Sequence, residues 1–192
     1  AVGFNPRAIH FTADSSLGVV VSDSYLSLVD LFAESLMPEL VSLALDDDPI
    51  ELLEDPPEAE EVVISGDGSF AFVRQFGTDR LLVVDLLQGE VDALNVGLNP
   101  TDLDISPDGS TVVVVARSDH KLVVFDAEDP FSNGGDPIEE IELYEDLDLG
   151  SLVFDPTGDK AIVYTTASLL DRYVAWDVIE GSTSRKALEK PI

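Results

Sequence analysis

The chain repeats itself, and this repetition limits the folds that it can adopt. The segment Val2-Gly3-Phe4-Asn5-Pro6 returns as Val96-Gly97-Leu98-Asn99-Pro100, and the apolar pattern that follows each proline occurs twice more, at 62–68 and 152–158. Self-similarity at intervals of about 40–50 residues is typical of arrays in which each unit stacks on the next. The sequence therefore predicts four repeats of one structural unit within a single domain.

Each repeat contains short apolar runs separated by turn residues. In the third repeat, strands are expected at Thr101–Ser106, Thr111–Arg117 and Lys121–Phe125, and a looser fourth at Ile138–Leu143. Turn residues separate the first two strands, because Pro107-Asp108-Gly109 ends in a glycine that adopts positive φ without strain. The pattern indicates four antiparallel strands in each repeat.

Both faces of each predicted sheet must be covered. The run Val112–Val115 is apolar without alternation, which is typical of strands buried on both sides. Sheets stacked around a ring cover each other in this way. We therefore predict an all-β fold of β-propeller blades, four four-stranded antiparallel repeats with approximate bounds 1–56, 57–98, 99–148 and 149–192.

The third apolar run of each repeat stops at an aspartate. These four residues, Asp30, Asp85, Asp126 and Asp177, lie 55, 41 and 51 positions apart, which is close to the about 40–50 residues of a propeller blade. An aspartate at the start of a turn commonly accepts a backbone N–H. We interpret all four as caps of the turn that follows.

The repeat also resembles a known family. The elements Asn99-Pro100, Ile105-Ser106-Pro107-Asp108-Gly109-Ser110 and Leu122-Val123-Val124-Phe125-Asp126 are similar to the YVTN-type repeats of bacterial and archaeal surface proteins. The naming tetrapeptide itself is replaced, for example by Val113–Ala116. The resemblance implies a β-propeller of that superfamily and an extracellular, periplasmic or cell-surface location. It does not imply one activity, since the repeat occurs in scaffolds, lyases, cytochromes and quinoproteins.

Whether four repeats complete the ring is a separate question. Propellers carry about four to eight blades, and those with this repeat usually have about seven. The chain starts at a first strand and ends near Ser182–Pro191, which is predicted as a fourth strand, so no strand interlocks the ends. We favour a partial ring or half-propeller over a closed four-bladed ring. Its partner would then be a second copy of the chain or the remaining blades of a larger ring.

The net charge excludes several partners. The chain carries 39 acidic and 10 basic residues, for a net charge of −29, and no cysteine. Such a charge repels phosphate backbones and anionic lipids, so no nucleic-acid partner is expected. The longest aliphatic run is far shorter than the about 20 residues of a membrane span, so no membrane insertion is expected. The acidity fits either adaptation to a saline habitat or a cationic ligand.

One loop is a candidate calcium site. Asp126, Asp129, Asn133 and Asp136 surround Gly134-Gly135, and Ca²⁺ prefers oxygen ligands on flexible loops. The spacing does not match an EF-hand, and a solvated acidic loop is the simpler interpretation. No other cofactor is expected.

No catalytic residue is assigned. His10 and His120 are the only histidines, which is too few for a typical zinc site without cysteine. Glu60 and Glu61 align with Thr101 and Asp102 at the entry to the innermost strand, where paired carboxylates could perform acid–base chemistry. The favoured function is a noncatalytic binding or scaffold module for a protein or glycan partner. The alternative is a fragment of a larger propeller enzyme, a hydrolase, lyase or redox protein, with its catalytic residues on missing blades.

The charge generates a first prediction. Added salt should raise the melting temperature, because the Debye length falls from about 30 Å at 0.01 M to about 8 Å at 0.15 M and self-repulsion is screened. Thermal melts followed by circular dichroism at increasing NaCl concentration measure this. A melting temperature that stays flat or falls as the salt rises to about 0.5 M would contradict it.

Overall fold

The computed structural model describes residues 2–45, 57–165 and 172–187, and its strands form four separate antiparallel sheets. Sheet 1 contains β1 (Ala8–Phe11), β2 (Leu17–Val21), β3 (Tyr25–Asp30) and β4 (Glu39–Ser42). Sheet 2 contains β5 (Ala59–Ile64), β6 (Phe70–Gln75), β7 (Arg80–Asp85) and β8 (Val91–Asn95). Sheet 3 contains β9 (Pro100–Ile105), β10 (Thr111–Ala116), β11 (Lys121–Asp126) and β12 (Glu139–Glu142). Sheet 4 contains β13 (Ser151–Phe154), β14 (Lys160–Tyr164), β15 (Arg172–Asp177) and β16 (Ser182–Ala187).

Every sheet is a meander in which strands pair in chain order. The predicted strands of the third repeat are confirmed with ends shifted by at most one residue, and a short 3-10 turn, η2 (Arg117–Asp119), joins β10 to β11. His120 closes this turn in the left-handed region at φ 51° and is half-buried. The end of the predicted last strand, 188–191, lies outside the described residues. In the part of the chain that the structure describes, no helix is long and apolar enough to cross a membrane.

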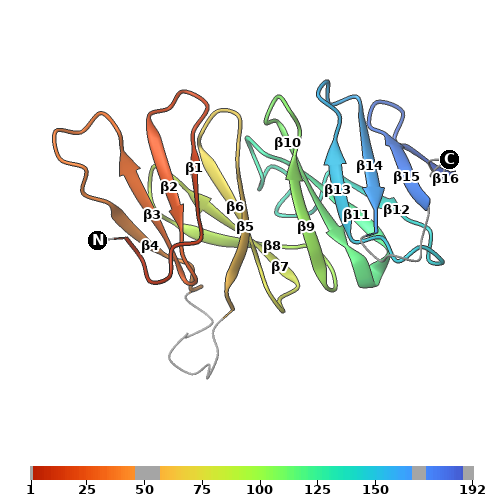
Figure 1. Cartoon of the computed structure of the whole chain (residues 1–192), viewed down its shortest axis with the longest axis horizontal. Helices are drawn as coiled ribbons and strands as arrows, with labels where there is room; N and C mark the ends of the chain where they lie inside the picture. The colour runs from red at the N-terminus through yellow and green to blue at the C-terminus, as the bar shows by residue number, and fades with distance from the viewer. Residues whose placement is uncertain (1, 46–56, 166–171, 188–192) are drawn as a thin grey trace, which may run out of the picture.

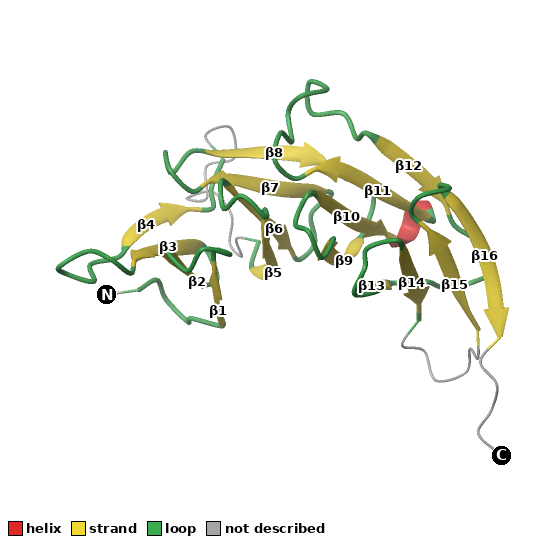
Figure 2. Cartoon of the chain, turned by 90° about the horizontal axis from the view of Figure 1, so that it is seen from above, coloured by secondary structure: helices red, strands yellow, loops and turns green. Residues whose placement is uncertain are grey.

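The sheets stack side by side as a fan. Their first strands, β1, β5, β9 and β13, lie along the concave side, and their fourth strands lie along the convex side (Figure 2). Sheets 1 and 4 occupy opposite ends of the array (Figure 1). The described residues therefore form an open arc, which confirms the prediction of a partial ring.

The core is divided among the three interfaces between successive sheets. One apolar cluster lies between sheets 1 and 2, a second between sheets 2 and 3, and a third between sheets 3 and 4. The run Val112–Val115, predicted to be buried on both sides, contributes to two of these clusters. Val112 and Val114 face sheet 2, while Val113 and Val115 face sheet 4. All four are fully buried. Each such valine stabilises the fold by about 1.5–3 kcal/mol relative to exposure.

The turn between the first and second strands is built in the same way in three sheets. In sheet 3 the Ser106 hydroxyl donates to Asp108 Oδ1 at 2.6 Å and accepts from the Thr111 N–H at 2.9 Å. Thr12 and Ser65 make the equivalent contacts in sheets 1 and 2. The hydrogen bond from Ser106 and those from Ser110 hold the pKa of Asp108 below its ordinary value.

The aspartates that end the third strands act as the predicted caps. Backbone N–H groups of the following turn donate to each of them, at distances of 2.8–3.2 Å, for Asp30, Asp85, Asp126 and Asp177. These bonds satisfy donors that no strand partner reaches. The recurring Asp is therefore explained by backbone hydrogen bonding at every one of its four positions.

Two glycines bring neighbouring turns into contact. The Gly66 N–H in sheet 2 donates to the Gly109 carbonyl in sheet 3 at 2.9 Å. A Cβ at Gly109 would lie 2.3 Å from Gly66 Cα, a separation that neither backbone can accommodate without moving. Gly109 also has a φ of +75°, where side chains are strained.

This contact can be separated from backbone strain by a matched pair of variants. Gly77 has the same φ of +75°, and nothing lies within 4 Å of the place that a Cβ would take there. Gly77→Ala should therefore lose only the about 1–2 kcal/mol of a left-handed alanine. Gly109→Ala should lose a further about 1–3 kcal/mol, because it also overpacks the turn contact. Urea unfolding of both variants measures the difference, and equal losses would contradict it.

Candidate functional site at the inner strands

The concave side of the array carries carboxylates at equivalent positions. Val62 pairs with Val73 and Leu103 pairs with Val114, so these two inner-strand residues occupy the same place in sheets 2 and 3. Glu61 and Asp102 directly precede them. The two acidic residues are therefore repeats of one position.

Each carboxylate ties its own inner strand to the next one. Glu61 Oε2 accepts the Leu103 N–H at 3.0 Å, and Asp102 Oδ2 accepts the Leu152 N–H at 2.5 Å. Asp104 Oδ2 also accepts the Phe154 N–H, at 3.2 Å. The acceptors therefore satisfy N–H groups on the edge of β9 and β13, and they fix the spacing of sheets 2, 3 and 4 at the concave side.

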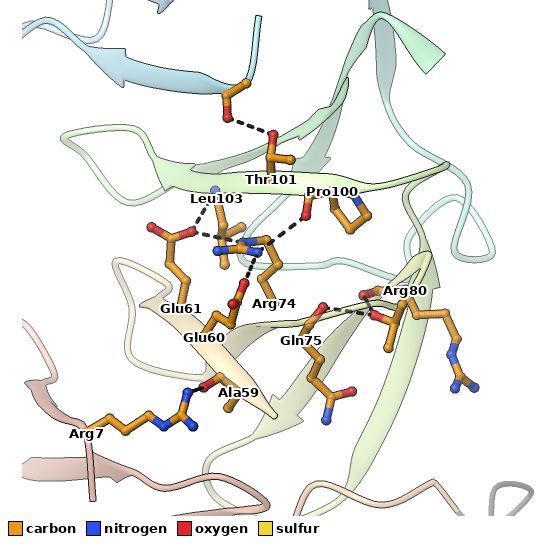
Figure 3. A network of polar contacts seen from close by, with 12 residues as sticks. Arg7, Ala59, Glu60, Glu61, Arg74, Gln75, Arg80, Pro100, Thr101 and Leu103 are labelled. Carbon is orange, nitrogen blue, oxygen red and sulfur yellow. Dashed lines mark hydrogen bonds and ion pairs between the residues drawn. The ribbon is translucent and has the colours of Figure 1, made fainter. Parts of the chain in front are cut away.

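Arg74 of β6 holds the first of these ties in place. Its Nε lies 3.1 Å from Glu61 Oε2 and its Nη1 lies 2.6 Å from Glu60 Oε2, as Figure 3 shows. Nη1 also donates to the Pro100 carbonyl at 3.4 Å. The Arg74 side chain is only 12% exposed. The guanidinium thus links two carboxylates of β5 to the first residue of β9.

Burial dominates the electrostatics of the two ties. Desolvation raises the pKa of Glu61, the nearby charge of Asp102 raises it further, and the hydrogen bond from Arg74 opposes both. Desolvation also raises the pKa of Asp102, against the hydrogen bond from the Leu152 N–H. A carboxyl with a raised pKa is suited to proton transfer, but here each group is held by neighbouring sheets. The contacts favour a structural role for Glu61 and Asp102.

The link between sheets 1 and 2 is made differently. Ala8 of sheet 1 occupies the position that Glu61 and Asp102 occupy in sheets 2 and 3. Arg7 takes over the link by donating from Nη1 to the Ala59 carbonyl at 3.4 Å and by pairing with Glu58 and Asp23. His10 lines a cavity of about 280 Å³ beside this link, together with Glu61 and Asp104. Burial lowers the pKa of His10. His10 on β1 pairs with Val19, so it lies at the concave side on the face that packs against sheet 2.

A cleft opens between sheets 2 and 3. It has a volume of about 880 Å³ and lies where the β6–β7 turn meets the β8–β9 connection. Phe76 and Leu98, 72% and 57% exposed, supply its apolar surface. Its polar lining comes from Glu60, Arg74, Thr78, Asp79, Arg80, Asn99 and Thr101. The cleft combines an aromatic ring with hydroxyl, amide, carboxylate and guanidinium groups.

Sequence reasoning found the acidic part of this region and missed the rest. It placed Glu60 and Glu61 at the inner strand, but assigned no role to Arg74, Phe76 or Arg80. Arg74 did carry a signal, since it is a lone cation directly after the apolar run Phe70–Val73. A charge at the end of a buried strand requires a partner, and the two glutamates were the nearest candidates in the preceding strand.

The four candidate calcium ligands lie at the end of β11 and in the loop that follows it. Asp126 Oδ1 is engaged by the N–H groups of Glu128 and Asp129. Asp136 lines a separate cavity of about 510 Å³, while Asn133 accepts the Asp136 N–H through its carbonyl. Among the described residues, no three Asp, Glu or His side chains gather to hold a metal ion. Calcium binding by Asp126, Asp129, Asn133 and Asp136 stays a prediction.

Comparison with solved structures identifies the architecture. Kuenenia stuttgartiensis hydrazine synthase matches with 19% identity and a TM-score of 0.69 over 99% of this chain and 51% of that chain. The Myceliophteria thermophila Cps50 (Swd1) β-propeller domain matches with 17% identity and a TM-score of 0.63, over 92% of this chain and 58% of that chain. The fold is that of a β-propeller. Apo AztD from Citrobacter koseri matches with 14% identity and a TM-score of 0.66, over 96% of this chain and 47% of that chain.

The four sheets are therefore propeller blades, and the chain spans about half the length of these propeller-containing chains. No family model matches the sequence, and no curated protein matches it. The resemblance to YVTN-type repeats remains a prediction.

The tie made by Glu61 can be tested by removing first its charge and then its oxygen. Glu61→Gln retains an acceptor for the Leu103 N–H and, because the pKa of Glu61 is raised, removes a charge that the fold disfavours at pH 7. We expect stability equal to or above that of the wild type. Glu61→Ala leaves the Leu103 N–H without this acceptor and should lose about 1–3 kcal/mol.

Urea unfolding at pH 7 and pH 4 compares the variants. A raised pKa means that the Glu61 charge opposes folding above that pKa, so any advantage of Glu61→Gln should shrink as the pH falls and Glu61 takes up its proton. Glu60→Ala, which loses only a partly exposed partner of Arg74, is the control and should lose under about 1 kcal/mol. Equal losses for Gln and Ala at position 61 would show that the hydrogen bond is not what matters.

Proposed function

We propose that the chain is a noncatalytic binding module made of propeller blades, and that its partner, a protein or a glycan, contacts the cleft between sheets 2 and 3. The exposed Phe76 ring beside a polar lining is the observation that carries this proposal. Export or display on the cell surface is proposed with it, supported by the resemblance of the repeats to those of surface proteins.

The dimensions and chemistry of the cleft favour a glycan over a protein. A concave volume of about 880 Å³ is within the about 300–1,000 Å³ range of small-ligand sites, whereas protein partners usually bury a broad surface. A sugar ring presents C–H groups on one face, which pack on an aromatic ring such as Phe76. Its hydroxyls both donate and accept, which suits the carboxylate of Asp79 and the amide of Asn99.

A second candidate is a fragment of a larger propeller enzyme, a hydrolase, lyase or redox protein. The observation that favours it is the coverage of only about half of each matching chain, one of which is a hydrazine synthase. In this alternative the catalytic residues lie on blades outside the 192 residues. The length of the native reading frame, and histidine, arginine or tryptophan residues in any additional repeats, would separate the two candidates.

A glycan array followed by calorimetry tests the cleft. The wild-type chain should bind a defined oligosaccharide, and Phe76→Ala should weaken this binding at least about tenfold, as expected for an aromatic anchor. Leu87→Ala, which alters an exposed apolar residue of the β7–β8 turn outside the cleft lining, is the matched control and should bind as the wild type does.

Two outcomes would overturn the glycan proposal. An empty array combined with capture of a protein that depends on Phe76 would assign the cleft to a protein partner. Oligosaccharide binding that is unchanged in Phe76→Ala would place the binding site elsewhere on the molecule.

A further inference from the structure

We infer that two copies of this chain close a ring head to tail, with the outer face of sheet 4 in one copy packed on the outer face of sheet 1 in the other. This inference does not depend on the cleft or its ligand. It follows from what the two end sheets expose and from how the inner sheets cover the same positions.

The outer face of sheet 4 exposes positions that are buried in every other sheet. Ile162 pairs with Val153 and is 43% exposed, whereas its equivalents in sheets 1, 2 and 3 are 0% exposed. Those equivalents, found by the same register in each sheet, are Val19, Phe72 and Val113. Val153 and Tyr164 extend the exposed surface on the same face. Sheet 4 thus presents the surface that sheets 1, 2 and 3 each use to bind the next sheet.

The outer face of sheet 1 is the complementary surface. Ile9 is 54% exposed, whereas its equivalents Val62, Leu103 and Leu152 are at most 5% exposed in the sheets that follow. Phe11 and Leu40 are exposed on the same face. The N-terminal segment reaches the β3 part of this face, where the Gly3 N–H donates to the buried Ser27 hydroxyl at 3.1 Å. The side chains of Ile9 and Phe11 on β1 remain exposed for contact with a second copy.

The three internal interfaces dictate the orientation of the contact. At each one the face that carries Val19, Phe72 or Val113 packs on the face that carries Val62, Leu103 or Leu152. Ile162 and Ile9 continue these two series at the ends of the array. Sheet 4 of one copy on the β1 part of sheet 1 of another repeats the inner-strand part of the internal interface, while sheet 1 on sheet 1 would not.

The curvature of the array agrees with a ring completed by a second copy. The sheets fan with their first strands on the concave side, so continuing the series bends it toward closure (Figure 2). Two copies related by a two-fold axis through the ring would supply both missing contacts at once.

The charges also favour head-to-tail pairing over contact between two copies of sheet 1. Residues 8–42 contain five acidic and no basic residues, whereas residues 151–187 contain five acidic and four basic residues. Lys160 lies on the strand of Ile162, where it pairs with Asp177 at 3.1 Å and keeps 62% of its side chain exposed. Contact of sheet 4 with sheet 1 therefore places this cation near a sheet that has none, which lowers repulsion in a chain of net charge −29.

Light scattering coupled to size exclusion tests the assembly at 0.15 M and 0.5 M NaCl, concentrations at which charge repulsion is screened to about 8 Å or less. The expected mass is twice 20.7 kDa and should not increase with protein concentration. A mass of one chain at all concentrations would overturn the inference. Blades outside this chain would then be the candidates for covering the outer faces of sheets 1 and 4. A mass that grows without limit would show open filaments and would overturn ring closure.

Two variants and their mixture test the orientation. Ile9→Glu and Ile162→Glu should each be monomeric, because every interface in either homodimer contains one buried glutamate. Mixed together, they should form a heterodimer, since Ile162 of the first variant and Ile9 of the second are both intact and complete one interface. Dimers of Ile162→Glu alone would instead indicate contact between two copies of sheet 1.

Controls separate assembly from folding. Ile179→Glu changes an exposed residue of the β15–β16 turn and should remain dimeric. Circular dichroism must show that each monomeric variant retains its strands. If either variant unfolds, Phe11→Glu and Val153→Glu repeat the same test on the same two faces. A mixture of folded monomeric variants that stays monomeric would overturn the head-to-tail ring.

Discussion

The fold depends on one constraint: the two middle sheets bury both of their faces, and only neighbouring sheets can cover them. Val112 and Val114 face one neighbour while Val113 and Val115 face the other, and all four are fully buried. A two-layer sandwich would leave one face of each sheet to water, which these residues do not tolerate. The hydrogen bonds at the concave side and the cleft between sheets 2 and 3 both lie where two sheets pack against each other.

Hydrogen bonds refine this arrangement at its inner edge. Apolar packing is non-directional, so it holds two sheets together without fixing how far one slides on the other. The carboxylates of Glu61 and Asp102 accept specific N–H groups of the next inner strand, and such bonds depend steeply on geometry. They set the register between blades. Burying the carboxylate of Glu61 costs hydration of its charge, and the hydrogen bond from Arg74 offsets part of that cost.

The sequence was sufficient for the fold because the repeat is local. The apolar runs, the Ser106–Asp108 turn and the aspartate at the end of each third strand all act within a few residues, so their pattern is visible in the sequence. The inner ties join residues 42 and 50 positions apart, and only the stacking of sheets brings these together. The glutamates could therefore be placed at the inner strand, and Arg74 on the adjacent strand carried a local signal, while the partner on the next sheet, the Leu103 N–H, could not be predicted. The cleft was missed for a related reason, since Phe76 and Leu98 belong to two connections that meet only between sheets 2 and 3, and a single exposed apolar residue in a turn is ordinary in any protein.

The division of the core into three clusters also governs how the molecule comes apart. Sheets 2 and 3 are each held by two apolar interfaces, and sheets 1 and 4 by one. In a linear array with nearest-neighbour contacts, stability is approximately a sum of unit and interface contributions. Local opening therefore begins at the two end sheets and proceeds inward. Closure of the array into a ring would remove both of these starting points.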